Sequence, residues 1–146
     1  MNRFAIASAI AFACTAAQAG PKEEALAVVD LWSKAFAASD VDAIARLYAA
    51  DATFFGTGSK ALVSTPGPVR SYFEAALLRD RPRGATLIEP AAIELSDSLV
   101  LVTGLDTVTG VRDGQPTKSP GRVSFLIQRR PAGWQIVHFH RSAMPQ

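Results

Sequence analysis

The sequence predicts an α+β domain in which three N-terminal helices pack on a curved antiparallel sheet. Two patterns support this fold class: apolar residues recur at helical spacing between residues 22 and 77, and they alternate with polar residues from residue 86 onward. The dipeptide Asp113-Gly114 lies between two alternating segments and is typical of a tight hairpin. Because the chain has 146 residues, of which 49% are hydrophobic, we expect one domain with one core.

The first 19 residues have the pattern of a secretory signal peptide. Arg3 precedes an apolar run from Phe4 to Ala13, and Ala17 and Ala19 are the small residues that a signal peptidase reads. The run falls short of the roughly 20 residues that span a bilayer. We therefore expect residues 1–19 to be removed. Residues 20–146 would then form a periplasmic or secreted domain with no membrane partner.

Cysteine content and net charge argue against a lipoprotein and against a nucleic-acid-binding protein. The only cysteine, Cys14, lies within the expected signal peptide, and the bulky Phe12 before it argues against a lipoprotein signal. The mature domain would be free of cysteine, which suits an oxidising compartment. It would lose one of 15 basic residues, Arg3, and none of 13 acidic ones, so the formal net charge would fall from +2 to +1. Such a charge does not predict a nucleic-acid partner.

Three helices are predicted in the first half. The first runs from about Lys22 to Ala38, because apolar residues recur there at intervals of three and four. They are Ala25, Val28, Val29, Trp32, Ala35 and Phe36. Asp40 is the expected N-cap of a short second helix. Its inward residues would be Val41, Ile44, Leu47 and Tyr48.

A loop over residues 51–56, leading into a short strand, is predicted to separate the second helix from the third. The third helix is predicted to start near Pro68, whose fixed φ suits a first helical turn. One side of it carries Val69, Tyr72, Phe73, Ala76 and Leu77. The arginine-rich segment from Arg79 to Gly84 is interpreted as a solvated loop.

Four strands are predicted in the second half. They span Thr86–Leu95, Leu99–Val111, Lys118–Arg129 and Trp134–Arg141. Pro90 predicts a bulge or an edge position, because proline cannot donate to a strand ladder. Alternation in the last strand assigns its residues to two faces. One face carries Gln135, Val137, Phe139 and Arg141, and the other carries Trp134, Ile136, His138 and His140.

Asp106 is the candidate site residue with the clearest physical argument. It is the only charge on a strand face that it shares with Val100, Val102, Gly104 and Val108. A carboxylate among apolar neighbours needs a partner, which Arg122 or Arg141 would provide from the next strands. Two interpretations stay open: an ion pair that holds the sheet together, and a cavity for a small anion or a polarised carbonyl.

Several motifs are absent from the sequence. There is no glycine-rich phosphate loop, no Gly-x-Ser-x-Gly nucleophile elbow and no His-Glu-x-x-His helix. His138 and His140 share a face but lack a third ligand in their strand. We therefore expect no metal and no cofactor.

The carboxy-terminal run of residues 133–145, Gly-Trp-Gln-Ile-Val-His-Phe-His-Arg-Ser-Ala-Met-Pro, closely resembles the last strand of the association (hub) domain of calcium/calmodulin-dependent protein kinase II. Arg122-Val123 and Tyr72-Phe73-Glu74 resemble motifs of the same family, and the segment from Pro90 to Asp97 keeps its spacing. The resemblance covers about residues 22–145. That family belongs to the NTF2-like, SnoaL-like superfamily of cone-shaped α+β domains, which includes ketosteroid-isomerase-type enzymes and polyketide cyclases.

The resemblance implies a domain that dimerises or forms larger rings and has an arginine-lined pocket. Arg122 and Arg141 fall on two of the family's pocket arginines, whereas Asp106 falls where the family has a third. Val69 replaces the family's pocket histidine. The sequence has no kinase region, so neither kinase activity nor calmodulin binding is expected.

We expect an exported hub-like domain that homo-oligomerises and binds a small anionic or carbonyl-bearing molecule. The expected ligand contacts are Arg122, Arg141, Asp106 and Tyr48. The alternative is an isomerase, cyclase or hydratase of the ketosteroid-isomerase type, with Asp106 as general base. Asp106 favours this alternative, but no second acidic residue lies on the deduced pocket strands. A third interpretation gives the domain no ligand.

We expect protein recovered from the periplasm to begin at Gly20, because Ala17 and Ala19 precede that position and the apolar run ends upstream of it. Intact-mass measurement decides this. A mass that retains residues 1–19, or one that carries acyl chains on Cys14, would contradict the prediction.

Overall fold

The computed structural model describes residues 19–64 and 66–145, so the expected signal peptide, apart from Ala19, lies outside the described residues. The predicted fold class is confirmed: three helices pack with a curved, antiparallel-dominated sheet, and all strands but the first follow the helices in the chain. The helices are α1 (Pro21–Ala38), α2 (Val41–Arg46) and α3 (Pro66–Leu77), and the strands are β1 (Tyr48–Phe55), β2 (Gly84–Ser96), β3 (Leu99–Arg112), β4 (Gln115–Arg130) and β5 (Gly133–Ala143). No helix among the described residues is long and apolar enough to cross a membrane.

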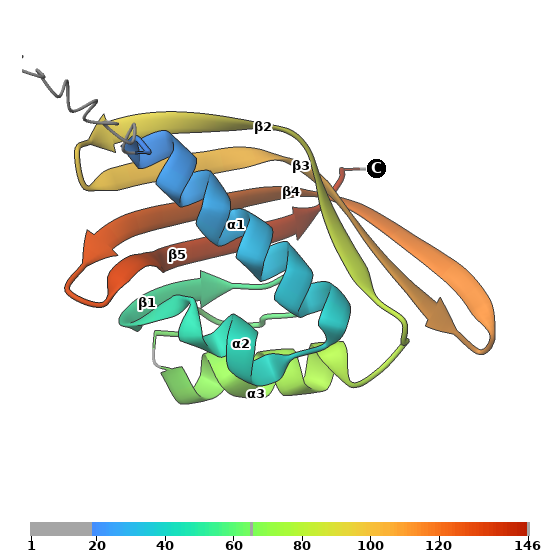
Figure 1. The fold of residues 1–146 in the computed structure, drawn as a ribbon. Helices are drawn as coiled ribbons and strands as arrows, with labels where there is room; N and C mark the ends of the chain where they lie inside the picture. Colours follow the sequence, from blue (N-terminus) through green and yellow to red (C-terminus); the bar gives the residue numbers. More distant parts are fainter. Residues whose placement is uncertain (1–18, 65, 146) are drawn as a thin grey trace, which may run out of the picture.

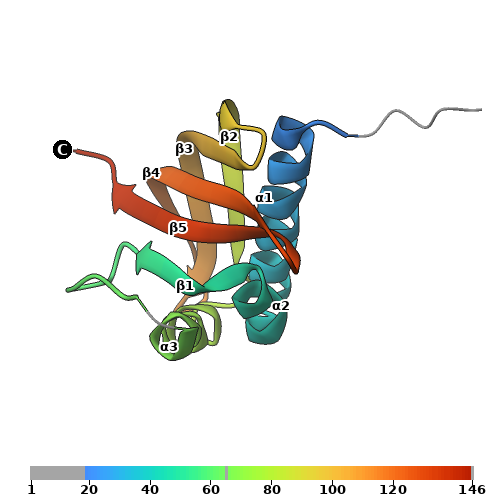
Figure 2. The same cartoon turned by 90° about the vertical axis from the view of Figure 1, so that its left-hand side faces the viewer.

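The five strands form one sheet in the order β1-β5-β4-β3-β2. Helix α1 crosses one face of the sheet, while α2 and α3 lie at its β1 side (Figures 1 and 2). Strands β3 and β4 extend beyond their neighbours as a twisted hairpin (Figure 1). This arrangement leaves the helix side of the sheet partly enclosed, and none of the described helices covers the opposite side, called here the outer face.

Strand β1 corrects the prediction of a loop over residues 51–56. The strand already begins at Tyr48, which was expected on the second helix, and it pairs in parallel with β5. The Ile136 amide donates to the Leu47 carbonyl over 2.8 Å, and Phe54 bridges to Val63. Parallel pairing joins segments about 90 residues apart, so local sequence signals do not reveal it.

The core lies between α1 and the sheet, with Trp32 at its centre. The indole is 1% exposed, and its Nε1 donates to the Tyr48 hydroxyl over 3.0 Å. Its ring packs against Phe36, Phe73, Phe125 and Phe139 at centroid distances of 5.2–6.2 Å. The predicted amphipathic face of the first helix is therefore confirmed, since all six of its apolar residues are buried.

Turn chemistry follows the sequence closely. Asp113 and Gly114 have φ values of 51° and 75°, the left-handed pair that a two-residue hairpin of this kind requires. At the predicted bulge, Glu89 has φ 42° and the β2–β3 register shifts between Ile88 and Ala91. Strand β2 also lies at the sheet edge. The missing N–H of Pro90 therefore does not cost the sheet a hydrogen bond between central strands.

A bulge in β5 overturns part of the predicted face assignment. Leu126 pairs with His138 but Ile127 pairs with Ile136, so one extra residue of β5 lies between these pairs. Ile136 therefore turns to the same side as Phe139, and both side chains are buried in the core. The prediction that Ile136 shares a face with His138 and His140 is wrong, because strict alternation cannot anticipate a bulge.

The core position of Ile136 leads to a stability prediction. We expect Ile136→Ala to lower the free energy of unfolding by about 2–5 kcal/mol, the usual cost of a large-to-small change at a buried site. The control His140→Ala removes an exposed side chain of the same strand and should stay within about 0.5 kcal/mol of wild type. Urea unfolding measures both variants. Equal losses would contradict the bulged register.

Candidate functional site

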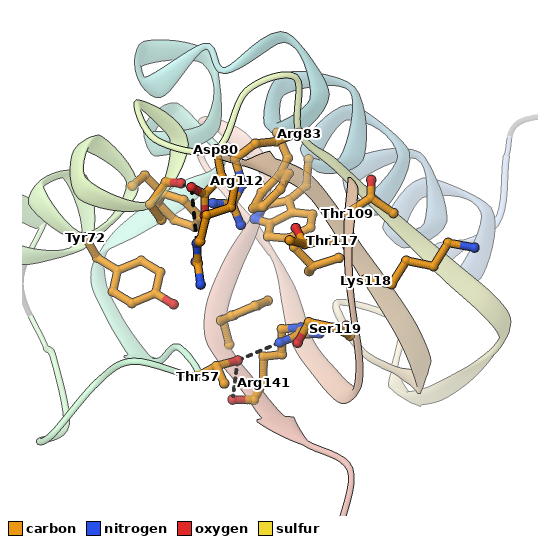
Figure 3. A pocket seen from close by; sticks show the side chains of 16 residues that line it. Thr57, Tyr72, Asp80, Arg83, Thr109, Arg112, Thr117, Lys118, Ser119 and Arg141 are labelled. Atoms are coloured by element: carbon orange, nitrogen blue, oxygen red, sulfur yellow. Dashed lines mark hydrogen bonds and ion pairs between the residues drawn. The ribbon is translucent and has the colours of Figure 1, made fainter. Parts of the chain in front are cut away.

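A cavity of about 500 Å³ opens on the helix side of the sheet, between α1, α3 and the extended part of β3 and β4 (Figure 3). Such a volume is typical of sites for small organic molecules. Its apolar wall is formed by Trp32, Phe36, Phe73, Ala76, Val108 and Phe139. This wall is continuous with the core, so the cavity is a place where core packing is incomplete.

Polar groups surround the apolar wall. Hydroxyl groups come from Thr57, Tyr72, Thr109, Thr117 and Ser119, and charged groups come from Asp80, Arg83, Arg112, Lys118 and Arg141. The lining thus includes four cations and one carboxylate. A site with this composition suits a molecule that has an apolar body and a negative or strongly polar end.

Asp106 and Arg141 form a buried ion pair at one end of the cavity. Arg141 Nε donates to Asp106 Oδ2 over 2.6 Å, and the two residues are 8% and 2% exposed. Arg141 Nη1 donates to the Thr57 hydroxyl and Nη2 to the Ser119 carbonyl, each over 2.7 Å. The prediction that Asp106 has an arginine partner is confirmed, and the partner is Arg141.

Gly121 makes room for this ion pair. The residue lies on β4 opposite Asp106 of β3, between the two strands that supply the pair. A Cβ atom at this position would lie 2.6 Å from Arg141 Nη2 and 2.7 Å from Asp106 Oδ1. The pair can therefore pass over β4 only because residue 121 has no side chain.

Arg122 does not join Arg141 in the cavity, so the prediction that they meet there is wrong. Val123 pairs with Arg141 across the β4–β5 ladder, and both side chains face the core. Arg122 precedes Val123 and points to the outer face, where it is exposed. The register of the two strands, which the sequence leaves open, decides this.

Asp106 does not line the cavity, which weighs against a role as general base. Its side chain is 2% exposed and lies behind Arg141, and its buried Oδ1 has no hydrogen-bond partner in the described part of the chain. A base must come within hydrogen-bond reach of the proton that it removes. Asp106 instead holds the Arg141 guanidinium in place.

Tyr48 also lies outside the cavity, contrary to the prediction of a ligand contact. Its hydroxyl accepts the Trp32 indole N–H inside the core, and burial raises the pKa of Tyr48 well above its usual value. Tyr72 is the tyrosine that lines the cavity (Figure 3). The helical spacing of apolar residues in the third helix predicts that Tyr72 faces inward, so the sequence does indicate Tyr72 as a candidate lining residue.

The sequence does not reveal three of the lining residues, Asp80, Arg83 and Arg112. The first two lie in the segment 79–84, for which the sequence predicts a solvated loop, and Arg112 lies at the end of β3. The Val111 amide donates to the Asp80 carbonyl over 2.9 Å, which fastens this loop to β3. Arg112 Nη2 donates to the Asp80 carboxylate over 2.7 Å, and this bond lowers the pKa of Asp80. These contacts join segments about 30 residues apart, which no local pattern indicates.

The two histidines lie away from the cavity, on the outer face. His138 Nδ1 shares a hydrogen bond of 2.7 Å with the Thr53 hydroxyl, and burial lowers the pKa of His138. Within residues 19–64 and 66–145, no three histidine, cysteine or acidic side chains gather closely enough to hold a metal ion.

Comparison with solved structures agrees with this fold. A candidate calcium/calmodulin-dependent protein kinase II association domain from Xanthomonas campestris is 26% identical, with a TM-score of 0.78 over 88% of this chain and 94% of that one. The CaMKII hub homology domain of Chlamydomonas reinhardtii is 23% identical, with a TM-score of 0.72 over 84% and 97%. A candidate dehydratase of the NTF2-like family from Streptomyces avermitilis is 15% identical, with a TM-score of 0.75 over 85% and 97%.

Comparison with protein families gives one assignment. No curated protein matches the sequence. Residues 25–146 match the SnoaL-like domain, which covers all of β1–β5, α2 and α3 and most of α1. The resemblance to the NTF2-like and SnoaL-like superfamily is therefore confirmed, and the chain belongs to the SnoaL-like domain family.

Proposed function

We propose that this protein is a binding domain for a small amphipathic anion, such as an aromatic carboxylate. The observation that carries the proposal is the composition of the cavity: an aromatic wall around Trp32, Phe73 and Phe139 beside a lining of four cations and one carboxylate. The apolar body of the ligand would replace water against the wall. Its negative end would be drawn to the cationic side.

Binding is favoured over catalysis by the state of the carboxylates. Asp106 is buried behind Arg141, and Asp80, the one carboxylate of the lining, is bonded to Arg112. Neither group is placed to accept a proton from a bound molecule. The signal-peptide pattern of residues 1–19 supports export, so the proposed binding domain would act outside the cytoplasm.

A panel of aromatic carboxylates and their neutral amides tests the proposal. We expect indole-3-acetate to bind at least about tenfold more tightly than indole-3-acetamide, because a charged hydrogen bond contributes about 1.5–3 kcal/mol. Isothermal titration calorimetry in chloride buffer gives both dissociation constants. If no carboxylate of one to three rings binds, or if the amides bind equally well, the proposed function is wrong.

Substitution of Asp106 separates its structural role from a catalytic one. We expect Asp106→Asn to lower the free energy of unfolding by about 3 kcal/mol, because it leaves the Arg141 charge buried without a counter-charge. Indole-3-acetate should still bind. Urea unfolding and calorimetry measure these effects, with exposed Asp113→Asn as the matched control. Wild-type stability in Asp106→Asn would contradict the structural role.

We further propose that the protein forms homodimers or larger rings through the outer face of its sheet. Apolar side chains gather there on paired strands: exposed Ile88 opposes exposed Leu105, and exposed Ile93 opposes the partly buried Leu101. Ile88, Ile93 and Leu105 are 44–48% exposed. Soluble monomers rarely carry apolar patches above a few hundred Å², so a second copy is the favoured cover.

Light scattering tests this self-association. We expect at least a dimer at micromolar concentration, and we expect Leu105→Lys to shift the protein to monomer by placing a charge in the proposed interface. Leu31→Lys is the matched control, since Leu31 is an exposed leucine on α1, on the other side of the sheet. A monomeric wild type, or an equal effect of both substitutions, would exclude this interface.

A further inference from the structure

Three arginines of the cavity lining differ in how their guanidinium groups are occupied. The Nε and Nη2 groups of an arginine form an edge that suits a carboxylate with two parallel hydrogen bonds. Arg112 presents this edge to Asp80, with Nε and Nη2 at 3.2 and 2.7 Å from Oδ2. Arg141 directs Nε to Asp106 and Nη2 to the Ser119 carbonyl. The Nε and Nη2 groups of Arg112 and Arg141 are therefore already hydrogen-bonded within the protein.

Arg83 is the exception. Its Nη1 donates to the Ala76 carbonyl over 2.7 Å, and its guanidinium carbon lies 5.5 Å from the centre of the Phe36 ring. Its Nε is buried and has no hydrogen-bond partner within residues 19–64 and 66–145. Among the described residues, no carboxylate forms an ion pair with it: the charge of Arg83 contributes to the lowered pKa of Asp80, but that carboxylate bonds Arg112.

Lys118 is the other cation of the lining without an acidic partner in the described part of the chain. It is exposed, and alternation places it on the opposite side of β4 from Ser119. Its side chain leads away from Tyr72 and Arg141 in Figure 3. It is therefore poorly placed to contact a molecule that lies against the aromatic wall.

We propose that Arg83 is the anion-binding residue of this cavity and that the ligand is a monocarboxylate whose apolar body lies against Trp32 and Phe36. The inference rests on the proposed function and names the contact that function needs. A carboxylate on the Nε and Nη2 edge would satisfy the buried donor and the uncompensated charge together. Arg83 would turn this edge toward the cavity, while Phe36 supports the face of the guanidinium.

This assignment gives Arg141 a different role. Arg141 is neutralised by Asp106 and bonded to Thr57 and Ser119, so it shapes the far end of the cavity. Tyr72 and Thr57 would offer hydroxyl groups to the part of the ligand opposite the carboxylate (Figure 3). Aromatic carboxylates with a polar substituent at the far end therefore match the cavity best.

The test uses indole-3-acetate, indole-3-acetamide and three variants of the full mature chain. We expect Arg83→Gln to raise the Kd of indole-3-acetate about 10- to 100-fold, because it removes a charged hydrogen-bonding partner, and to change the Kd of the amide less than about twofold. Arg83→Lys keeps the charge but not the two-bond edge, so it should restore only part of the affinity. Arg79→Gln, an exposed arginine of the same loop outside the lining, should behave as wild type.

The outcomes separate this inference from the proposed function. If wild type binds neither compound nor any other carboxylate of the panel, the proposed function fails and the inference with it. If wild type binds indole-3-acetate but Arg83→Gln and Arg83→Lys both keep its affinity, only the inference fails. Lys118→Gln then identifies whether Lys118 is the anion contact. A crystal structure of the complex should place the carboxylate within about 3 Å of Arg83 and not of Arg141.

Discussion

The ion pair between Asp106 and Arg141 is the constraint on which the site depends. It joins β3 to β5 across the backbone of Gly121, and it buries two charges that neither strand could bury alone. Because Asp106 takes the Arg141 Nε, the remaining donors of that guanidinium fasten the loop at Thr57 and the β4 carbonyl at Ser119. One end of the cavity is thus built from four segments held by one side chain.

The pairing of charges in the lining also explains why the cavity remains cationic. A domain with an expected net charge of only +1 still has four cations in one lining, and among the described residues acidic side chains pair with two of them, Arg112 and Arg141. Arg83, whose positive charge has no acidic partner among the described residues, lies beside the aromatic wall at Phe36. A positive charge next to an aromatic surface suits an anion with an apolar body. The outer face, with its exposed apolar side chains on β2 and β3, is on the opposite side of the sheet from α1, so ligand binding and self-association would use separate surfaces (Figure 2).

Much of the fold was predictable because its signals are local. The stripe that includes Trp32, the cap at Asp40 and the hairpin at Asp113-Gly114 all depend on neighbours within a few residues. Strand β1 and the bulge before His138 were not predictable, because each depends on the pairing of distant segments. The bulge matters for the site, since it brings Phe139 and Arg141 to the same side as Ile136.

The sequence by itself determined the fold class, the buried face of α1 and the need of Asp106 for a cationic partner, because periodicity and the cost of burying a charge are properties of short segments. Tertiary structure alone decided that Arg141 is that partner, that Arg122 and Tyr48 lie outside the cavity, and that Arg83 lies in its wall. The positions of Arg141, Arg122 and Tyr48 depend on strand register. The position of Arg83 depends on the contact between the loop after α3 and the distant β3–β4 hairpin. A shift of one residue in register would reverse the face of every side chain in the strand, and only the packed sheet fixes it.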